Sequence, residues 1–266
     1  MPDPLEPAPP VPTQLRRERI RALVGERDFA RVSDLSGAFG VSEVTIRSDL
    51  DVLSARGLVR RVRGGAMPRA VPAERPFEQT QVEFAIEKDG IGALAASLVS
   101  TGDSIILDVG TTTAAIAQAL VRRQNLTSLT VFTNSLKVAL VLEPAIPRFE
   151  VIVTGGTLRA LQHSLVNPLG HWLLEHVTVD TVFLGCNGVD PEGGITNINL
   201  PEMEIKRLML AAGRRRVVVA DGSKVGRVAL AHLCPIEQID ILVTGPSADA
   251  EILAAFRERG LDVRVA

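Results

Sequence analysis

The most informative chemistry in this sequence follows an apolar run that reads as a buried strand. After Asp108 and Val109 come Gly110 and three consecutive threonines, Thr111, Thr112 and Thr113. A glycine lets the backbone approach a ligand, and a helix that begins here presents unpaired N–H groups and the positive end of its dipole. Together with three hydroxyl groups, these features predict a cradle for an anion. The alternative interpretation is a plain helix cap, since threonine is common at that position.

Other polar residues stand at the ends of later apolar runs. Asn134 offers a donor and an acceptor that suit a sugar hydroxyl, although it could instead close its own loop as an Asx turn. Lys224 follows Asp221 by three residues, so it could pair with a phosphate, hold Asp221, or be an ordinary solvated lysine. The remaining residues of this kind are Thr133, Gly155 and Gly156. By themselves the two glycines indicate only a tight turn of the backbone.

Apolar strand-like runs alternate with helical stretches from about residue 82 onward, which is the pattern of a mostly parallel sheet covered by helices. The expected strands are Ser104–Val109, Leu129–Thr133, Phe149–Thr154, Thr181–Cys186, Val217–Asp221, Ile239–Thr244 and Val263–Val265. The expected helices are Glu87–Ser100, Thr112–Arg122, Ser135–Glu143, Pro168–His176, Leu200–Ala212 and Ala248–Arg259. Ligands of such α/β sheets bind at the carboxyl ends of the strands. An open, Rossmann-like α/β domain over residues 82–266 would therefore gather the polar residues on one rim.

A different chemistry is expected near the N-terminus, in Val41–Arg63. Ser42 stands at an N-cap position, and Ile46 and Leu50 follow at helical spacing, so one face of a helix can be buried. A basic hairpin that turns at residues 64–65 comes next, while two shorter helices precede, the second capped by Ser33. This pattern predicts a winged helix-turn-helix over residues 13–67, whose second helix lies in a DNA groove. A solvated amphipathic helix with a charged turn is the alternative.

The residues expected to face DNA lie on the outward side of that helix and on the hairpin. They are Ser42, Glu43, Thr45, Arg47, Ser48, Arg60, Arg61 and Arg63. Charge supports this placement, because residues 13–70 hold 12 Lys and Arg against 7 Asp and Glu, although the whole chain has a net charge of −2. Aromatic residues make up only 3% of the chain, with no tyrosine, which argues against a stacking platform for single strands and favours double-stranded DNA.

The rest of the composition limits the other functions. Residues 1–12 are expected to be a disordered tail, and residues 68–81, with three prolines, an irregular linker. We expect Cys186 and Cys234 to be reduced and buried, and we expect no metal site, no cofactor and no membrane span, hence a cytoplasmic protein. One DNA-binding unit makes few contacts, so a homodimer or homotetramer reading paired half-sites is expected.

At this point the chain resembles the DeoR family of bacterial transcriptional regulators. The resemblance rests on Val41–Leu50, reading VSEVTIRSDL, on RVRGGA at Arg61–Ala66, and on the D-x-GTTT, TN, GG and D-x-SK motifs of the second domain. Ser48 and Val109 depart from the arginine and the serine usual in that family. The resemblance implies a fold similar to ribose-5-phosphate isomerase. It also implies that Asp108, Gly110–Thr113, Thr133, Asn134, Gly155, Gly156 and Lys224 line a pocket for a phosphorylated sugar.

The function expected from these features is a DNA-binding transcriptional regulator, a repressor of carbohydrate metabolism genes that responds to a phosphorylated sugar. The first rival is an enzyme, a sugar-phosphate isomerase with an accessory DNA-binding domain, for which Asp108, Asp190 or Asp221 could act as the base. The second rival, an architectural DNA-binding protein, leaves the polar rim of the second domain without a role.

Overall fold

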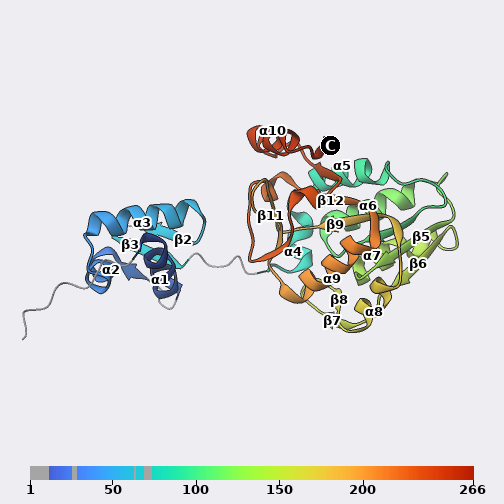
Figure 1. The fold of residues 1–266 in the computed structure, drawn as a ribbon. Helices are drawn as coiled ribbons and strands as arrows, with labels where there is room; N and C mark the ends of the chain where they lie inside the picture. The colour runs from blue at the N-terminus through green and yellow to red at the C-terminus, as the bar shows by residue number, and fades with distance from the viewer. Residues whose placement is uncertain (1–11, 26–28, 63, 69–73) are drawn as a thin grey trace, which may run out of the picture. The chain divides into compact units, whose positions relative to one another are not determined.

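The computed structural model describes residues 12–25, 29–62, 64–68 and 74–266. The chain divides into two compact units, Met1–Pro72 and Ala73–Ala266 (Figure 1). Among the described residues, no helix is both long and apolar enough to cross a bilayer. The predicted division into a small N-terminal unit and a larger α/β unit thus matches the architecture that the structure has.

The smaller unit is a three-helix domain with a small antiparallel sheet of order β1-β3-β2. Its elements are α1 (Thr13–Gly25), β1 (Ala30–Arg31), α2 (Val32–Phe39), α3 (Glu43–Ala55), β2 (Val59–Val62) and β3 (Gly65–Pro68). Ser42 caps α3 by accepting a hydrogen bond of 3.2 Å from the backbone N–H of Thr45. Ile20, Ile46 and Leu50 are fully buried in the core of this unit. The predicted winged helix-turn-helix is confirmed.

A buried ion pair fixes α3 to the first helix of this unit. Asp49 of α3 is inside the core, and its two carboxylate oxygens accept hydrogen bonds from Nε of Arg16 at 2.6 Å and Nε of Arg17 at 2.7 Å. Both arginines belong to α1. Because a buried carboxylate is costly without a cation, this contact sets the position of α3 against α1.

The larger unit is built on a parallel sheet of order β15-β14-β12-β9-β4-β5-β6. Its strands are β4 (Ser104–Leu107), β5 (Leu129–Thr133), β6 (Phe149–Val153), β9 (Val179–Gly185), β12 (Gly213–Ala220), β14 (Ile241–Thr244) and β15 (Asp262–Val265). Two small antiparallel sheets accompany it: β7 (Thr157–Arg159) with β8 (Ser164–Val166), and β10 (Gly188–Asp190), β11 (Gly194–Asn197) and β13 (Ala231–Cys234).

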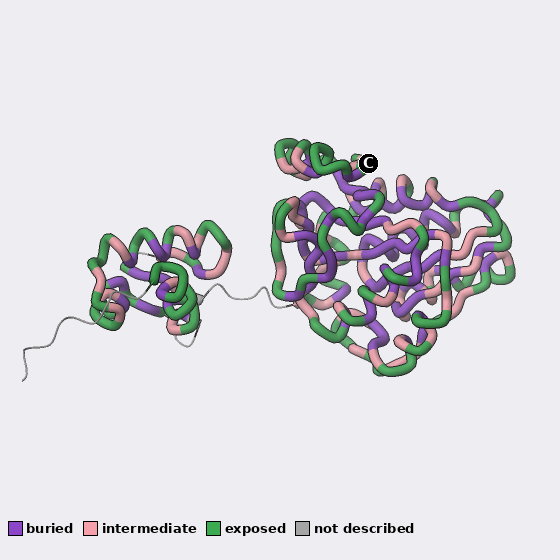
Figure 2. The backbone as a smooth tube through the Cα atoms, viewed as in Figure 1, coloured by how far each residue is buried: buried purple, intermediate pink, exposed green. Residues whose placement is uncertain are grey.

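Helices cover both faces of this sheet, so the unit has three layers. The helices are α4 (Phe77–Val82), α5 (Ala85–Ala96), α6 (Thr111–Arg122), α7 (Leu136–Leu142), α8 (Leu169–Glu175), α9 (Leu200–Ala212) and α10 (Ala250–Glu258). Successive strand residues point to opposite faces. Ile105 and Leu107 accordingly pack with α5 and α6, whereas Ile106 packs with α9. Figure 2 shows the strands buried between exposed helical surfaces.

The strand order reverses between β4 and β9. From β4 the chain runs outward through β5 and β6, and then returns to β9 on the other side of β4 before running outward through β12, β14 and β15. The first connections and the later ones therefore leave in opposite directions, so the switch point of the strand order lies at the carboxyl ends of β4 and β9, the region called the crevice below. This crevice is the expected place for a ligand in an open α/β sheet.

Two local boundaries differ from the sequence prediction. The helix α2 begins at Val32 and no side chain caps it, whereas Ser33 lies inside its first turn and donates to Asp34 at 3.2 Å. The residues 68–81 were expected to be an irregular linker, but Phe77–Val82 is helical and Phe77 is buried in the larger unit. Pro76 is the N-cap residue of this helix. Proline is tolerated at the start of a helix, so Pro76 allows the helix to begin at Phe77.

The buried Asp49 should be essential to the smaller unit. Replacing Asp49→Asn leaves two arginines without their carboxylate, so we expect the unfolding free energy of this unit to fall by about 3 kcal/mol. Calorimetry of the full chain should show one transition moving to lower temperature. The matched control is Asp51→Asn, at an exposed site on the same helix, where a loss below about 0.5 kcal/mol is expected. Equal effects of the two substitutions would contradict this role of Asp49.

Candidate functional site

The crevice between β4 and β9 contains a buried ion pair that joins the sheet to a helix. Asp108 follows β4 and is fully buried, and it accepts a hydrogen bond from Nζ of Lys206 on α9. Lys206 also donates to the carbonyl of Gly185 at 2.9 Å, while the N–H of Gly185 donates to Asp108 at 3.1 Å. Three elements, β4, β9 and α9, therefore meet at one charged contact.

Burial raises the pKa of the Asp108 carboxyl above its ordinary value, and the Lys206 ammonium opposes that shift. The pair is nearly inaccessible, since the side chains of Lys206 and Asp108 are 3% and 0% exposed. Oδ1 of Asp108 has no hydrogen-bond partner within the described part of the chain. The crevice therefore holds two opposite charges away from water. It also contains a carboxylate oxygen that could accept a further hydrogen bond.

The threonine loop lies at the N-terminus of α6, as predicted. Gly110 has φ = 147°, a value that side chains rarely allow, and precedes the helix. Thr113 donates from Oγ1 to the carbonyl of Gly110 at 2.9 Å, so its hydroxyl shapes the loop. Thr111 is 8% exposed, and the hydroxyl of the buried Thr112 has no partner among the described residues. The capping interpretation thus accounts for Thr113 but leaves the hydroxyl of Thr112 unexplained.

The ends of β5 and β6 lie next to this loop in the sheet. Thr133 accepts at Oγ1 from the N–H of Ser135 at 3.1 Å, and its carbonyl accepts from the N–H of Thr154 at 3.0 Å. Asn134 is fully buried, and neither Nδ2 nor Oδ1 has a hydrogen-bond partner in the described ranges. The side chain of Asn134 is therefore not closing an Asx turn. A buried amide without partners is costly, so this position favours a ligand or an ordered water.

Gly155 and Gly156 both have positive φ, at 72° and 119°. A Cβ at Gly156 would lie 2.3 Å from the carbonyl oxygen of Val166, so a larger residue cannot fit without moving β8. At Gly155 the nearest contact of such a Cβ is an ordinary 3.6 Å from Leu169. The structure therefore gives Gly156 a packing role between β6 and β8. Direct contact of either glycine with a ligand stays a prediction.

Lys224 lies on the other side of the crevice, past the end of β12. Its ammonium is 3.4 Å from Asp221, and its side chain is 19% exposed. Lys88 is close to both, since Lys224 lowers and Asp221 raises its pKa, although burial is the main reason that the pKa of Lys88 falls to about 8. Lys224 and Lys206 both act to lower the pKa of Cys186, the residue that follows β9. Lys224 is thus held by Asp221 at the edge of the crevice.

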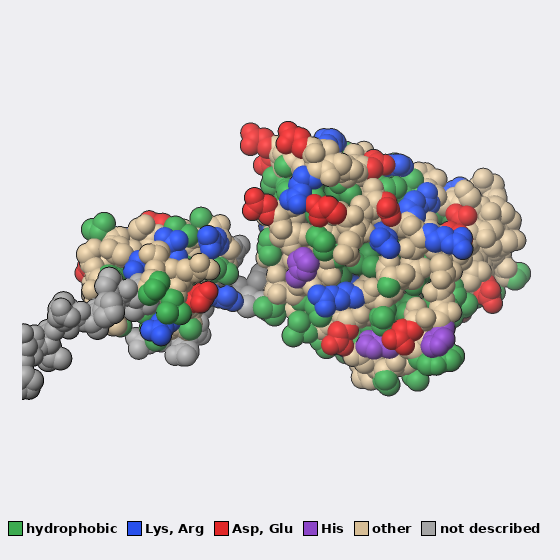
Figure 3. All heavy atoms as spheres, viewed as in Figure 1, with side chains coloured by type: hydrophobic (Ala, Val, Ile, Leu, Met, Phe, Trp, Pro, Cys, Tyr) green, Lys and Arg blue, Asp and Glu red, His purple; other side chains and the backbone are tan. Residues whose placement is uncertain are grey.

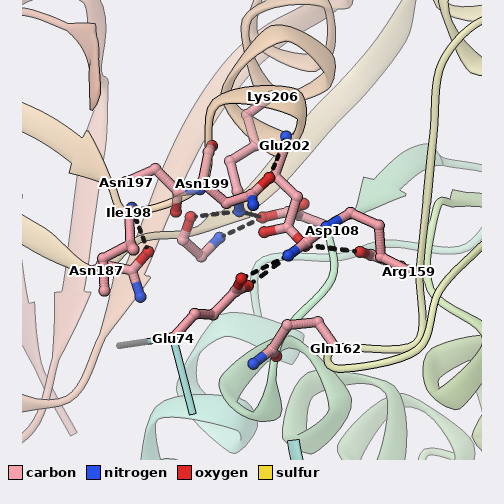
Figure 4. Close-up of polar contacts among 12 residues, drawn as sticks. Glu74, Asp108, Arg159, Gln162, Asn187, Asn197, Ile198, Asn199, Glu202 and Lys206 are labelled. Atoms are coloured by element: carbon pink, nitrogen blue, oxygen red, sulfur yellow. Dashed lines mark hydrogen bonds and ion pairs between the residues drawn. The ribbon is translucent and has the colours of Figure 1, made fainter. Parts of the chain in front are cut away.

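Sequence reasoning missed several charged residues that the fold brings to this crevice. Lys206 and Glu202 lie one turn apart on α9, and Arg159, at the end of β7, bonds to Glu202 and to Glu74 (Figure 4). Ser164 of β8 donates to Glu202 at 2.6 Å. The signal available in the sequence was the Glu202–Lys206 spacing on a helix expected to pack against the sheet. A pair four residues apart usually lies in solvent, so it was not recognised as buried.

The predicted DNA-facing side of α3 is exposed. Arg47 and Glu43 form an ion pair of 2.7 Å across one turn, and both side chains are about half exposed. Ser48 is exposed, Thr45 is partly buried, and Val44 is 71% exposed on the same surface. Because this helix turns polar side chains and one valine outward, it presents the kind of surface that reads base edges in a major groove.

The hairpin β2–β3 carries two of the three predicted arginines. Arg60 is exposed, whereas Arg61 is partly buried and pairs at 2.9 Å with Asp51 of α3, whose side chain is exposed. Arg63 lies outside the described residues. Figure 3 shows basic side chains on the surface around α3 and β2. On the face of the larger unit in that view, acidic and basic side chains are interspersed. Of the residues predicted to form a basic surface, Arg47 of α3 and Arg60 of β2 are therefore exposed, and Arg47 is paired with Glu43.

No group of three or more His, Cys, Asp or Glu side chains that could hold a metal ion occurs among the described residues. Cys186 and Cys234 are buried free thiols, and burial raises the pKa of each to about 11. The interpretation of both cysteines as buried thiols is confirmed.

Comparison with known proteins identifies the family to which both units are similar. The family described as "DeoR-like helix-turn-helix domain" matches residues 16–68, and the family described as "DeoR C terminal sensor domain" matches residues 83–246. The chain is 34% identical to the HTH-type transcriptional regulator GlpR of Haloferax volcanii over 93% of this chain and 96% of that protein. It is 27% identical to the glycerol-3-phosphate regulon repressor of Escherichia coli K12 over 94% of this chain and 98% of that protein.

Among solved structures, a ribose 5-phosphate isomerase A from Methanocaldococcus jannaschii has a TM-score of 0.39 and 18% identity, and the match covers 53% of this chain and 55% of that one. A likeness at this level is too distant to support any conclusion about activity.

The Asp108–Lys206 pair can be tested by removing each partner in turn. Lys206→Met leaves a buried carboxylate without its cation, so we expect the larger unit to lose about 3 kcal/mol of stability. Burial raises the pKa of Asp108 and Lys206 lowers it, so without Lys206 the folded variant keeps a proton that the unfolded chain releases. Its stability should therefore fall as the pH rises from the ordinary carboxyl pKa toward the raised pKa of the folded state.

The double substitution Asp108→Asn with Lys206→Met should restore most of the lost stability, because no buried charge then stays unpaired. Denaturant unfolding of all the variants at several pH values measures both effects. Additive losses in the double variant would show that the two side chains do not interact.

Proposed function

Because this chain belongs to the DeoR family of DNA-binding transcriptional regulators, we propose that it represses genes of carbohydrate metabolism and that a phosphorylated sugar controls its operator binding. The operator would be contacted by the exposed side of α3 and by the β2–β3 hairpin. The sugar phosphate would bind at the carboxyl ends of β4, β5 and β9. The name of the Escherichia coli relative, a repressor of a glycerol-3-phosphate regulon, supports both parts of this proposal.

The observation that carries the ligand proposal is the group of buried polar atoms without partners at the strand ends. Among the described residues, Asn134 and Thr112 have buried side-chain donors and acceptors without partners. Thr112 lies in the first turn of α6, and Asn134 directly follows β5, the strand that pairs with β4. Unpaired buried atoms cost free energy that a bound sugar can recover, since its hydroxyls both donate and accept. The adjacent helix N-terminus and Lys224 supply positive charge for a phosphate.

The proposed DNA contacts are of two kinds, one to base edges and one to phosphate groups. Arg47 can reach a guanine or a phosphate once it leaves Glu43, whereas Arg60 on the hairpin is suited to the phosphate backbone. A single recognition helix covers few base pairs, so we propose that at least two copies bind paired half-sites. The ligand would act through its different affinity for the free and the operator-bound arrangements.

Removing basic side chains from the DNA-facing surface should weaken operator binding. We expect Arg47→Ala and Arg60→Ala each to reduce affinity about tenfold and to lower the slope of log affinity against log salt by about 1. Arg214→Ala removes an exposed arginine from the larger unit and serves as the matched control. Fluorescence anisotropy with operator DNA across a salt series measures both quantities. Unchanged affinity and slope in both variants would overturn the assignment of this surface.

Changes at the strand ends should remove the ligand response and spare DNA binding. Thr111→Val keeps the side chain's size, and Lys224→Met removes a cation, so we expect each to weaken sugar-phosphate binding at least about tenfold. Thr127→Val, at an exposed site, is the control. Calorimetric titration with glycerol 3-phosphate, ribose 5-phosphate, glucose 6-phosphate and fructose 6-phosphate gives the affinities. Undiminished binding in both variants would exclude this pocket.

The same panel of sugar phosphates distinguishes a regulator from the rival isomerase. The relative from Haloferax volcanii is named a transcriptional regulator. We propose that this chain is also a regulator and that it binds its ligand without converting it. Incubation of the purified protein with each sugar phosphate, followed by separation of aldose and ketose forms, detects turnover. Conversion by the purified wild type would favour the enzyme.

A further inference from the structure

The segment that follows residues 69–73 is docked on the β7–β8 hairpin of the larger unit. The carbonyl of Arg75 accepts from Nε2 of Gln162 at 2.5 Å, and the N–H of Phe77 donates to the carbonyl of Leu161 at 3.0 Å. The ring of Phe77 is 2% exposed. The chain therefore enters the larger unit along this hairpin, and the first residues that it places there are held by hydrogen bonds to the hairpin loop.

Glu74, the first described residue of that segment, forms an ion pair with Arg159 of β7. Its two carboxylate oxygens accept from two nitrogens of the Arg159 guanidinium, with Nη1 to Oε1 at 3.3 Å and a shorter bond from Nη2 to Oε2. The side chains of Glu74 and Arg159 are only 14% and 18% exposed. A forked contact between a guanidinium and an acid is the geometry by which arginine binds carboxylates and phosphates alike.

Arg159 is also connected to the crevice. Its Nη1 bonds to Glu202, which lies one turn from Lys206 on α9, and Ser164 donates to the same carboxylate oxygen. The residue after Ser164 donates its N–H to the carbonyl of Asn134 at 2.7 Å. Figure 4 shows Glu74, Arg159, Glu202, Lys206 and Asp108 gathered in one polar cluster. The guanidinium therefore lies between the incoming segment and the residues proposed to bind ligand.

The charges around Arg159 limit what can bind there. Two carboxylates, from Glu74 and Glu202, share one guanidinium, so this group already carries an excess negative charge. An additional anion would face both carboxylates in a poorly solvated place, where repulsion is strong. Glu202 is 6% exposed and is also held by Ser164, whereas Glu74 lies at the start of its segment. An arriving anion would therefore exchange with Glu74.

We infer that Arg159 is an anion-binding group of the ligand pocket and that Glu74 occupies its place until a phosphate or carboxylate of the ligand displaces it. This inference rests on the proposed function, since it concerns the same pocket. Displacement of Glu74 releases the start of the segment that residues 69–73 join to the DNA-binding unit. The ligand's charge is thereby converted into the release of Glu74 from the β7–β8 hairpin.

Neutralising Glu74 should increase the affinity for anions. Glu74→Gln keeps the shape of the side chain but removes the competing charge, so inorganic phosphate should bind about tenfold more tightly to this variant than to the wild type. Arg159→Gln should lose that binding. Isothermal titration of the full chain with inorganic phosphate measures the affinities, and thermal unfolding confirms that each variant is folded.

The control for local charge is Glu78→Gln. Glu78 lies on the same segment and pairs with Lys137 and His163 of the larger unit, but it does not touch Arg159. Its neutralisation should leave phosphate affinity unchanged. A second measurement is hydrogen exchange: phosphate should speed exchange at the N–H of Phe77 in the wild type, because that N–H is bonded to the hairpin.

The outcomes separate this inference from the proposed function. Tighter phosphate binding by Glu74→Gln, with Glu78→Gln unchanged, supports the role of Arg159. Equal affinities of the wild type and Glu74→Gln, with binding still lost in Thr111→Val, would overturn the role of Arg159 and leave the pocket in place. Absence of phosphate binding in both the wild type and Glu74→Gln would overturn the inference and the proposed pocket together.

Discussion

The buried contact between Asp108 and Lys206 is the interaction on which the larger unit's chemistry depends. A strand supplies the carboxylate and a helix of the covering layer supplies the ammonium, and both bond to the backbone of Gly185 on the neighbouring strand. Neither charge could be buried alone, so the pair fixes α9 over the point where the strand order reverses. The polar side chains at the adjacent strand ends are thereby held in a place with little water, where an added charge interacts strongly.

The sheet could be predicted because each of its strands is an apolar run bounded by small or polar residues. The seven expected strands coincide with those of the parallel sheet to within a few residues, and Leu200–Ala212 was expected with its observed bounds. The two small antiparallel sheets were missed, since their strands have three or four residues and lack a hydrophobic period. The helix Phe77–Val82 was missed because its three neighbouring prolines indicated a linker, whereas burial of Phe77 decides its structure.

Some residues of the candidate sites could be predicted from their neighbours in the sequence, and others could not. The threonine loop, Asn134 and the outward side of α3 follow from neighbouring residues, so their positions could be predicted. Lys206, Glu202 and Arg159 reach the crevice only through contacts between residues 38 to 98 positions apart, which no local pattern reveals. The same holds for Asp49, which was recognised as part of a motif but not as the partner of two arginines on α1.

Cys186 has a consequence for how such a pocket would work in a living cell. Its thiol lies at the end of β9 beside the charged crevice, and burial raises its pKa to about 11, so at neutral pH only about one molecule in ten thousand carries the thiolate. Oxidants and electrophilic sugars react with thiolates rather than thiols. Burial of Cys186 therefore makes its thiol a poor target for oxidation, although it lies directly after the strand that bonds to Asp108 and Lys206.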